Sequence, residues 1–318
     1  MKRFAHLAAR DFPSAARALQ NGGVAKAGGT DLLDLLKERI VEPDEVVDLR
    51  GAARALRAGE ISALQTLAEV ASDENVLREF PALAKAAGEA ATPQIRNFAT
   101  VGGNLCQGTR CWYFRNASFS CTRRGDPACA ALVEGAETRY HAIFPEPSCV
   151  AAHSSNLAPA LIALGARVAC VGPGGERVLD VERLYREPEA GRMGDTVLEK
   201  GELIRAVLLE PSSMTRRSAY LEFRERLSFD FAVVAVAAAL DLAGGVVKEC
   251  RIVLGAVAPV PYRAEAAERA LRGKKPDDAA LSAAAEAAVE GARPLAQNGF
   301  KVPIAKTLVR RALEGLLA

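Results

Sequence analysis

Five of the seven cysteines in this 318-residue chain fall between Cys106 and Cys149, in a segment with neither helical nor strand periodicity. Four of them have the spacing C-x9-C-x7-C-x19-C: Cys111, Cys121, Cys129 and Cys149. A loop this long inside a compact protein is usually functional or disordered, and bound metal can order such a segment without secondary structure. Thiolate ligands select zinc, copper(I) or iron–sulfur clusters. We therefore expect a metal or cluster site here.

The spacing alone does not name the metal. Structural zinc sites usually have closely paired cysteines, and ferredoxin-type runs are also tighter than this one. Cys106 stands in a C-x4-C relation to Cys111 and is an alternative ligand. His141 and His153 flank the last of the four cysteines, which leaves a mixed Cys/His site open, although a local hydrogen-bonding role is the simpler interpretation. Free structural thiols are the remaining alternative.

Composition narrows the class of protein. The length exceeds the usual size of a single core, so we expect two domains. A net charge of +2 gives no argument for nucleic-acid binding, and the lack of an apolar stretch of about 18 residues predicts no membrane span. Because no hydrophobic signal follows the first residues, we expect a cytoplasmic chain with reduced or metal-bound thiols. A partner subunit with its own signal would instead export it to the periplasm.

Two glycine-rich loops are candidates for phosphate binding. Residues 27–32 (AGGTDL) lie between an expected strand and an expected helix, and residues 100–104 (TVGGN) precede the cysteine segment. Glycines let backbone N–H groups approach a phosphate, and a helix N-terminus adds a favourable dipole. Neither loop has the dinucleotide or Walker pattern, and each alone is as well explained as a capped turn. Their pairing favours a dinucleotide whose two phosphates both loops contact.

Periodicity and turn signals predict a mixed α+β protein. Helices are expected over residues 11–19, 32–39, 62–70, 80–91, 156–164, 264–271, 281–290 and 304–317. Strands are expected over residues 24–27, 45–49, 167–171, 176–179, 203–209, 232–242 and 246–258. The turn around Pro211 marks an expected domain boundary, which gives domains at 1–212 and 213–318.

Both loops resemble those of a known family. Residues 27–33 and 99–106 are similar to the FAD-binding loops in the medium flavoprotein subunit of molybdenum hydroxylases, which include xanthine dehydrogenases, carbon monoxide dehydrogenase and 4-hydroxybenzoyl-CoA reductase. The insertion over residues 105–150 resembles that of the [4Fe–4S]-carrying subunits of 4-hydroxybenzoyl-CoA reductase and bacterial periplasmic aldehyde oxidoreductase. Residues 109–115 and 139–144 are most similar to the latter, and the likeness extends over essentially the whole chain.

The resemblance implies a fold, cofactors and partners. The expected fold is a FAD-binding region of two α+β subdomains, of the vanillyl-alcohol-oxidase/PCMH-like type, followed by a smaller C-terminal α+β domain. Members of the family work with a [2Fe–2S] small subunit and a molybdopterin-binding large subunit, on which the substrate reacts. This chain would then bind FAD and a [4Fe–4S] cluster, pass electrons to an external acceptor, and contain no catalytic residue. The alternatives are a stand-alone FAD oxidoreductase and a zinc-stabilised binding module.

The resemblance also implies site residues. The cluster ligands would be Cys111, Cys121, Cys129 and Cys149. Residues expected to contact FAD are Ala25, Lys26, Ala27, Gly28, Gly29, Thr30, Asp31, Leu32, Thr100, Gly103, Asn104, Cys106, Gln107, Ser155, Asn156, Leu203, Arg224 and Arg226. Asn156 replaces an aspartate common in the family, and Arg224 and Arg226 are alternatives for one basic residue near the isoalloxazine.

Overall fold

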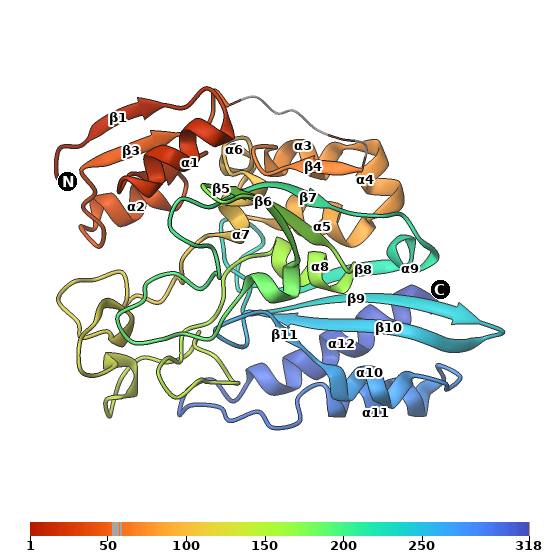
Figure 1. The fold of residues 1–318 in the computed structure, drawn as a ribbon. Helices are drawn as coiled ribbons and strands as arrows, with labels where there is room; N and C mark the ends of the chain where they lie inside the picture. The colour runs from red at the N-terminus through yellow and green to blue at the C-terminus, as the bar shows by residue number, and fades with distance from the viewer. Residues whose placement is uncertain (53–56, 58, 318) are drawn as a thin grey trace.

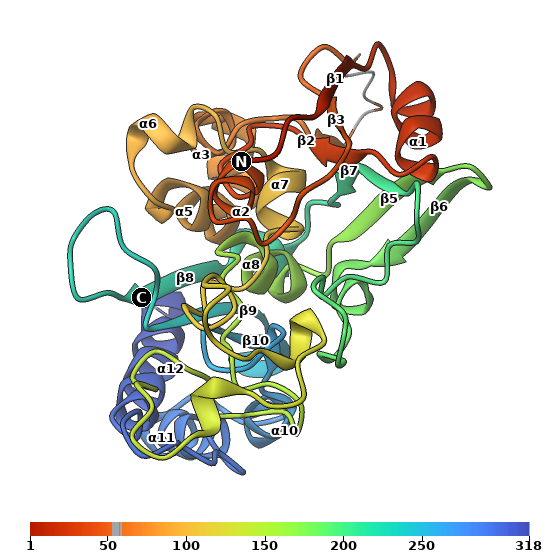
Figure 2. The ribbon, with the colours of Figure 1, turned by 90° about the vertical axis from the view of Figure 1, so that its left-hand side faces the viewer.

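The computed structural model describes residues 1–52, 57 and 59–317, and the described chain is a mixed α+β fold, as predicted (Figures 1 and 2). Its amino-terminal part is a parallel three-stranded sheet of order β1-β3-β2, which α1 contacts. Asp11 caps α1 by accepting a hydrogen bond from the Ser14 amide at 2.7 Å. The elements are β1 (Ala5–Ala8), α1 (Phe12–Gln20), β2 (Val24–Lys26), α2 (Leu32–Lys37) and β3 (Glu45–Asp48).

A second sheet follows in the antiparallel order β4-β7-β5-β6. The hairpin predicted from its glycine-rich turn is confirmed, because Gly172 of β5 pairs with Gly175 of β6. Val168 and Cys170 of β5 and Ile204 and Val207 of β7 share a core with α8, every residue of which is buried, whereas Val171 and Leu203 pack in the core around α1. The elements are β4 (Glu60–Ser62), β5 (Arg167–Gly172), β6 (Gly175–Asp180), the 3-10 helix η3 (Val181–Leu184), β7 (Leu203–Leu208) and α8 (Leu157–Ala163).

Short helices follow β4 in the chain, and one of them corrects a prediction. Ser62, expected to open a helix, ends β4, and its hydroxyl accepts from the Leu64 amide at 3.2 Å. The helix begins five residues later, because Thr66 and Glu69 form a reciprocal capping box. The helices are α3 (Leu67–Ser72), α4 (Glu74–Glu79), α5 (Pro81–Glu89), α6 (Pro93–Arg96) and α7 (Val101–Leu105).

The carboxy-terminal part is an antiparallel sheet of order β11-β10-β9-β8. Alternate residues of β9 enter two cores: Val234 and Val236 pack with α10–α12, whereas Ala235 and Ala237 pack with α5 and α8. Burial on both faces explains the continuous apolar run of this strand. The elements are α9 (Ser213–Arg216), β8 (Ser218–Phe223), β9 (Val234–Ala243), β10 (Val246–Gly255), β11 (Tyr262–Arg263), α10 (Glu265–Leu271), α11 (Asp278–Ala287) and α12 (Lys301–Leu317).

Four strands, β1, β4, β8 and β11, were not predicted as strands, and the last helix was predicted too short. The sequence did not indicate β1, four residues that are all exposed, or β8, which mixes apolar and charged residues. The last helix begins three residues before its predicted start, at Lys301. None of the described helices is long and apolar enough to cross a membrane.

The cysteine segment forms an irregular insertion, drawn yellow to olive at the lower left of Figure 1 and in front of the carboxy-terminal layer in Figure 2. Its regular structure between 106 and 150 is limited to two 3-10 helices, η1 (Thr122–Arg124) and η2 (Ala130–Leu132). The Ile143 amide donates to the carbonyl of Val257 at 2.8 Å, which attaches the insertion to the carboxy-terminal part.

Candidate functional site

The first glycine-rich loop joins β2 to α2 and lies directly against the second. A Cβ at Gly28 would stand 1.8 Å from the carbonyl oxygen of Phe98, so only glycine fits there. Gly29 has a φ of +78°, in the left-handed region that favours glycine. Within the described part of the chain, the backbone N–H groups of Gly28, Gly29, Thr30 and Asp31 find no acceptor. The loop therefore offers a row of free donors to an anionic group.

The second loop is different, because its amides are already bonded. Thr100 caps α7, and its hydroxyl accepts from the Gly103 amide at 3.2 Å. The amides of Val101 and Gly102 donate to carbonyls between β4 and α3 at 2.9 and 2.8 Å. The glycine pattern suggested two equivalent loops, but this one can contact a ligand only with other groups.

Asn104 connects the second loop to the start of α8. Its Oδ1 accepts from the Ser155 hydroxyl at 2.6 Å and from the Leu157 amide at 3.2 Å. Ser155 Oγ in turn accepts from the Ala158 amide at 3.0 Å. Asn104 and Ser155 are both buried, so these bonds fix the position of α8 relative to the loop.

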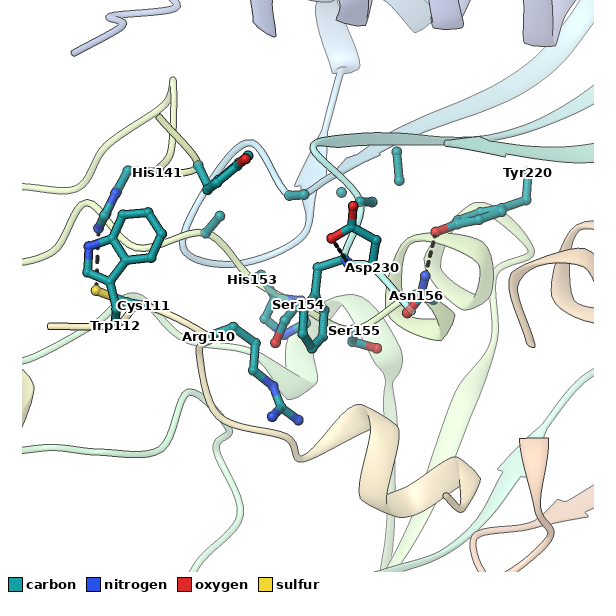
Figure 3. A pocket seen from close by; sticks show the side chains of 17 residues that line it. Arg110, Cys111, Trp112, His141, His153, Ser154, Ser155, Asn156, Tyr220 and Asp230 are labelled. Carbon is teal, nitrogen blue, oxygen red and sulfur yellow. Dashed lines mark hydrogen bonds between the residues drawn. The ribbon is translucent and has the colours of Figure 1, made fainter. Parts of the chain in front are cut away.

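Two adjoining cavities lie beside the loops. The loop cavity, of about 290 Å³, is lined by seven of the predicted FAD contacts: Thr30, Asp31, Gly103, Asn104, Gln107, Asn156 and Arg226. The aromatic cavity, of about 330 Å³, is lined by Ser155, Asn156, Trp112, Tyr140 and Tyr220 among others (Figure 3). Arg110, Asn156, Asp230 and Phe231 line both cavities, so one elongated ligand would reach from the glycine loops to the aromatic cavity.

Ten of the predicted contacts line neither cavity: Ala25, Lys26, Ala27, Gly28, Gly29, Leu32, Thr100, Cys106, Leu203 and Arg224. Leu203 is buried in the core cluster around α1. Arg224 is held by an ion pair with Glu89, while Arg226 reaches the loop cavity. Cys106 is exposed at the end of α7.

Sequence reasoning missed several lining residues. Tyr220 escaped notice because β8 was not recognised, yet its hydroxyl accepts from Asn156 Nδ2 at 3.2 Å and donates to Glu222 at 2.7 Å. Burial raises the pKa of Glu222. Arg110 lies over the ring of Phe231, 5.0 Å from its centroid, between the two cavities. The available signal for Arg110 was its place among the arginines of the cysteine segment, with Arg115, Arg123 and Arg124.

The four predicted cluster cysteines lie in one another's electrostatic field. Burial raises the pKa of Cys111 to about 12, and the neighbouring thiols of Cys149 and Cys121 add to this shift. Burial also raises the pKa of Cys129, again with contributions from Cys149 and Cys121. Cys106 is influenced by Cys170 and not by these four. These influences place the four cysteines near one another, and their role as cluster ligands stays a prediction.

Polar groups lie near three of these sulfurs. Backbone groups of Phe114 and Tyr113 near Cys111, and of Ala131 and Leu132 near Cys129, act against the increase in pKa that burial causes. Cys149 Sγ accepts from Arg123 Nε at 3.1 Å and from the Ala151 amide at 3.4 Å. No three His, Cys, Asp or Glu side chains in the described residues converge closely enough to hold a single metal ion, so the metal site stays a prediction.

The insertion is linked to the first glycine loop by charge. Asp31 pairs with Arg115 and, at 3.1 Å, with Arg110, and its Oδ2 accepts from the Gly108 amide at 2.8 Å. These side chains are mostly buried, which strengthens the ion pairs relative to exposed ones. Movement of the insertion would therefore be transmitted to the loop with the free N–H groups.

The carboxy-terminal part holds the insertion from the other side. Lys301 Nζ donates to the carbonyls of Tyr140, His141 and Ala256 at 3.2, 2.9 and 2.8 Å. Asn298 Nδ2 donates to His141 O at 3.0 Å. The imidazole of His141 lies 3.3 Å from Cys111 Sγ (Figure 3), and burial, with Lys301 nearby, lowers its pKa to about 4. The wall between the cysteines and the aromatic cavity is thus positioned by α12 and the loop before it.

Two protein-family models together match almost the whole chain. Residues 2–211 match the family model described as the FAD binding domain in molybdopterin dehydrogenase, and residues 218–316 match the CO dehydrogenase flavoprotein C-terminal domain. The chain therefore belongs to the family of FAD-binding medium subunits of molybdenum hydroxylases, and is the FAD-binding subunit of an oxidoreductase complex of that type.

Individual relatives agree with this assignment. The chain is 35% identical to the aldehyde oxidoreductase FAD-binding subunit PaoB of Escherichia coli K12, over 100% of this chain and 98% of that protein. It is 27% identical to the carbon monoxide dehydrogenase medium chain of Hydrogenophaga pseudoflava, over 99% and 98%. The solved carbon monoxide dehydrogenase from that organism superposes with a TM-score of 0.76, at 25% identity, over 99% of this chain and 97% of that one. Quinoline 2-oxidoreductase from Pseudomonas putida 86 gives 0.74 at 26% identity, over 100% of both.

Proposed function

We propose that the chain is the electron-transfer flavoprotein and iron–sulfur subunit of a molybdenum-dependent aldehyde oxidoreductase-like complex. Bound FAD supplies one- and two-electron transfer, and a [4Fe–4S] cluster supplies one-electron transfer. The chain holds these groups so that electrons pass between iron–sulfur centres, FAD and an external acceptor. It contributes no residue to substrate oxidation, which takes place on a partner subunit.

The residues around the two cavities fit FAD. The free amides of Gly28 to Asp31 suit a diphosphate, which carries negative charge and accepts hydrogen bonds. In the aromatic cavity, both ring nitrogens of His153 are buried and have no partner in the described chain. Burial and the nearby Arg123 lower the pKa of His153 to about 3. The neutral imidazole therefore offers one donor and one acceptor to a ring system with amide groups.

The single observation that carries the cluster proposal is that Cys111, Cys121, Cys129 and Cys149 lie near one another, with Cys111 in the lining of the aromatic cavity. A [4Fe–4S] cluster is held by four thiolates, and each of them ligates a different iron, so the sulfurs need not meet at one point. The Arg123 guanidinium and the Ala151 amide, which both donate to Cys149 Sγ, support an anionic ligand there.

Partners and domains follow from the family. We propose a [2Fe–2S] small subunit and a molybdopterin-binding large subunit as partners, and a division into 1–212, with the insertion over 105–150, and 213–318. The similarity to a subunit of an aldehyde oxidoreductase supports this choice of complex. We further propose that a partner's signal decides whether the assembled complex is cytoplasmic or periplasmic.

The test is metal and flavin analysis of the chain purified anaerobically with its partners. Bound FAD together with iron and acid-labile sulfide supports the proposal, whereas stoichiometric zinc without colour supports a binding module. A purified chain that oxidises a small substrate alone would support a stand-alone enzyme. Cys121→Ser should lose iron and keep FAD, and Cys106→Ser is the matched control that should keep both. Iron that persists in Cys121→Ser would contradict the ligand set.

A further inference from the structure

Arg123 is buried, although arginine side chains are mostly exposed in folded proteins. It lies in η1 and is 1% exposed. Its Nε donates to Cys149 Sγ at 3.1 Å, its Nη1 pairs with the buried Asp195, and its Nη2 is buried without a partner in the described chain. A buried guanidinium keeps its charge at any pH at which the protein folds, so a fixed cation contacts one of the four grouped sulfurs.

Further contacts fix this cation in place. The Thr122 hydroxyl donates to Ser148 O at 2.7 Å, and the Gly191 amide donates to Thr122 O at 2.8 Å. Ser148 Oγ donates to Pro188 O at 2.6 Å. The helix η1, the residue before Cys149 and the loop that carries Asp195 are therefore joined. These bonds hold the backbone of η1, and the Arg123 side chain could turn away from the sulfur only by breaking its pair with Asp195.

The two charges act in opposite directions. Reduction of an iron–sulfur cluster adds one electron, and so one negative charge, without making or breaking a bond. A cation near the sulfur stabilises the more negative state, and an anion destabilises it. Both effects are strong where water is excluded. Because Arg123 touches the sulfur and Asp195 stands behind it, the cation has the larger effect.

We propose that Arg123, with Asp195 as its counter-ion, is a positioning residue that raises the reduction potential of the cluster through Cys149. This inference rests on the proposed [4Fe–4S] cluster. Asp195 limits the increase and holds the guanidinium at the sulfur.

The test is to measure the reduction potential of the cluster in the chain purified anaerobically. The chain is titrated with dithionite and mediators, and the electron paramagnetic resonance signal reports the reduced fraction. Arg123→Gln should lower the equilibrium constant for one-electron reduction at least tenfold, about 59 mV. Asp195→Asn, of nearly the same shape, should shift the potential upward. Arg139→Gln removes the same charge from an exposed site in the insertion and should leave the potential close to that of the wild type.

Opposite shifts in the two variants are not expected from loosened packing. An unchanged potential in Arg123→Gln with full iron and FAD would overturn the inference, as would shifts of the same sign in both variants. If Arg123→Gln fails to retain iron, Asp195→Asn and Arg123→Lys test the inference instead. An unshifted reduction potential in Asp195→Asn would overturn the inference. So would a tenfold lower equilibrium constant for reduction in Arg123→Lys, because lysine retains the positive charge. If the wild-type chain contains no iron and no acid-labile sulfide, the proposed function itself is contradicted.

Discussion

Replacing Gly28 with alanine tests whether contact between the two glycine-rich loops controls FAD binding. The added Cβ would stand 1.8 Å from the oxygen and 2.6 Å from the carbon of the Phe98 carbonyl. Both are backbone atoms, so no rotamer change relieves the overlap. A normal carbon–oxygen contact of about 3.3 Å requires the loops to separate by roughly 1.5 Å. That separation moves the free amides of the first loop away from the position they hold now.

The size of the effect follows from the bonds at risk. A hydrogen bond to a charged group contributes about 1.5–3 kcal/mol, and each 1.4 kcal/mol is tenfold in affinity. Loss of one such bond to the diphosphate should weaken FAD binding at least tenfold, and overpacking should lower the free energy of unfolding by about 1–3 kcal/mol.

FAD titration of the flavin-depleted chain, followed by flavin fluorescence, measures this affinity. Gly174→Ala is the matched control, because a Cβ there meets nothing within 4 Å. If Gly28→Ala binds FAD as tightly as the wild type does, the first loop does not hold the diphosphate in the way we propose.

Three further changes probe the contacts around the site. Burial lowers the pKa of Lys301 to about 7. Above that pH the unfolded chain binds one proton more than the native chain, so the free energy of unfolding should rise between pH 7 and 10. Urea unfolding should show this rise in the wild type and not in Lys301→Met. Arg115→Gln breaks the pair with Asp31 and should lower the free energy of unfolding by about 1–3 kcal/mol, and an equal loss in the exposed control Arg139→Gln would contradict this. Asn104→Ala removes the acceptor of two buried donors and should lower the free energy of unfolding by about 1–3 kcal/mol. Hydrogen exchange should then be faster in the first turn of α8.

Much of the fold could be predicted because local signals agreed with the tertiary structure. The glycine turn between β5 and β6 and the long apolar run of β9 each had a local cause. The error at Ser62 arose because two residue types that favour N-caps lie close together, and only Thr66 has the glutamate three residues on that completes a capping box. The missed strand β8 is stabilised by its pairing with β9, which a single-sequence pattern does not reveal.

Individual residues of the candidate site could be predicted from the sequence, but the contacts between them could not. The four cysteines were named from their spacing, and their role as cluster ligands stays a prediction. By contrast, nothing in the sequence distinguished the two glycine loops, since the difference lies in which amides have acceptors elsewhere in the fold. Likewise, Arg224 and Arg226 looked equivalent until the structure paired Arg224 with the distant Glu89 and placed Arg226, which pairs with the nearby Asp230, at the loop cavity. Partners far apart in the chain decide such questions.

The insertion connects the two halves of the protein, and this gives cluster binding a structural consequence. It has little regular structure of its own, so its order depends on side-chain contacts such as those of Arg124, which donates to three carbonyls within the insertion. On one side it is tied to Asp31 beside the free amides, and on the other to Lys301 of α12. Its residues Trp112 and His141 form a wall of the aromatic cavity. Thiolates held by a cluster would cross-link this segment from within, so the proposed cluster would order the insertion as well as carry electrons.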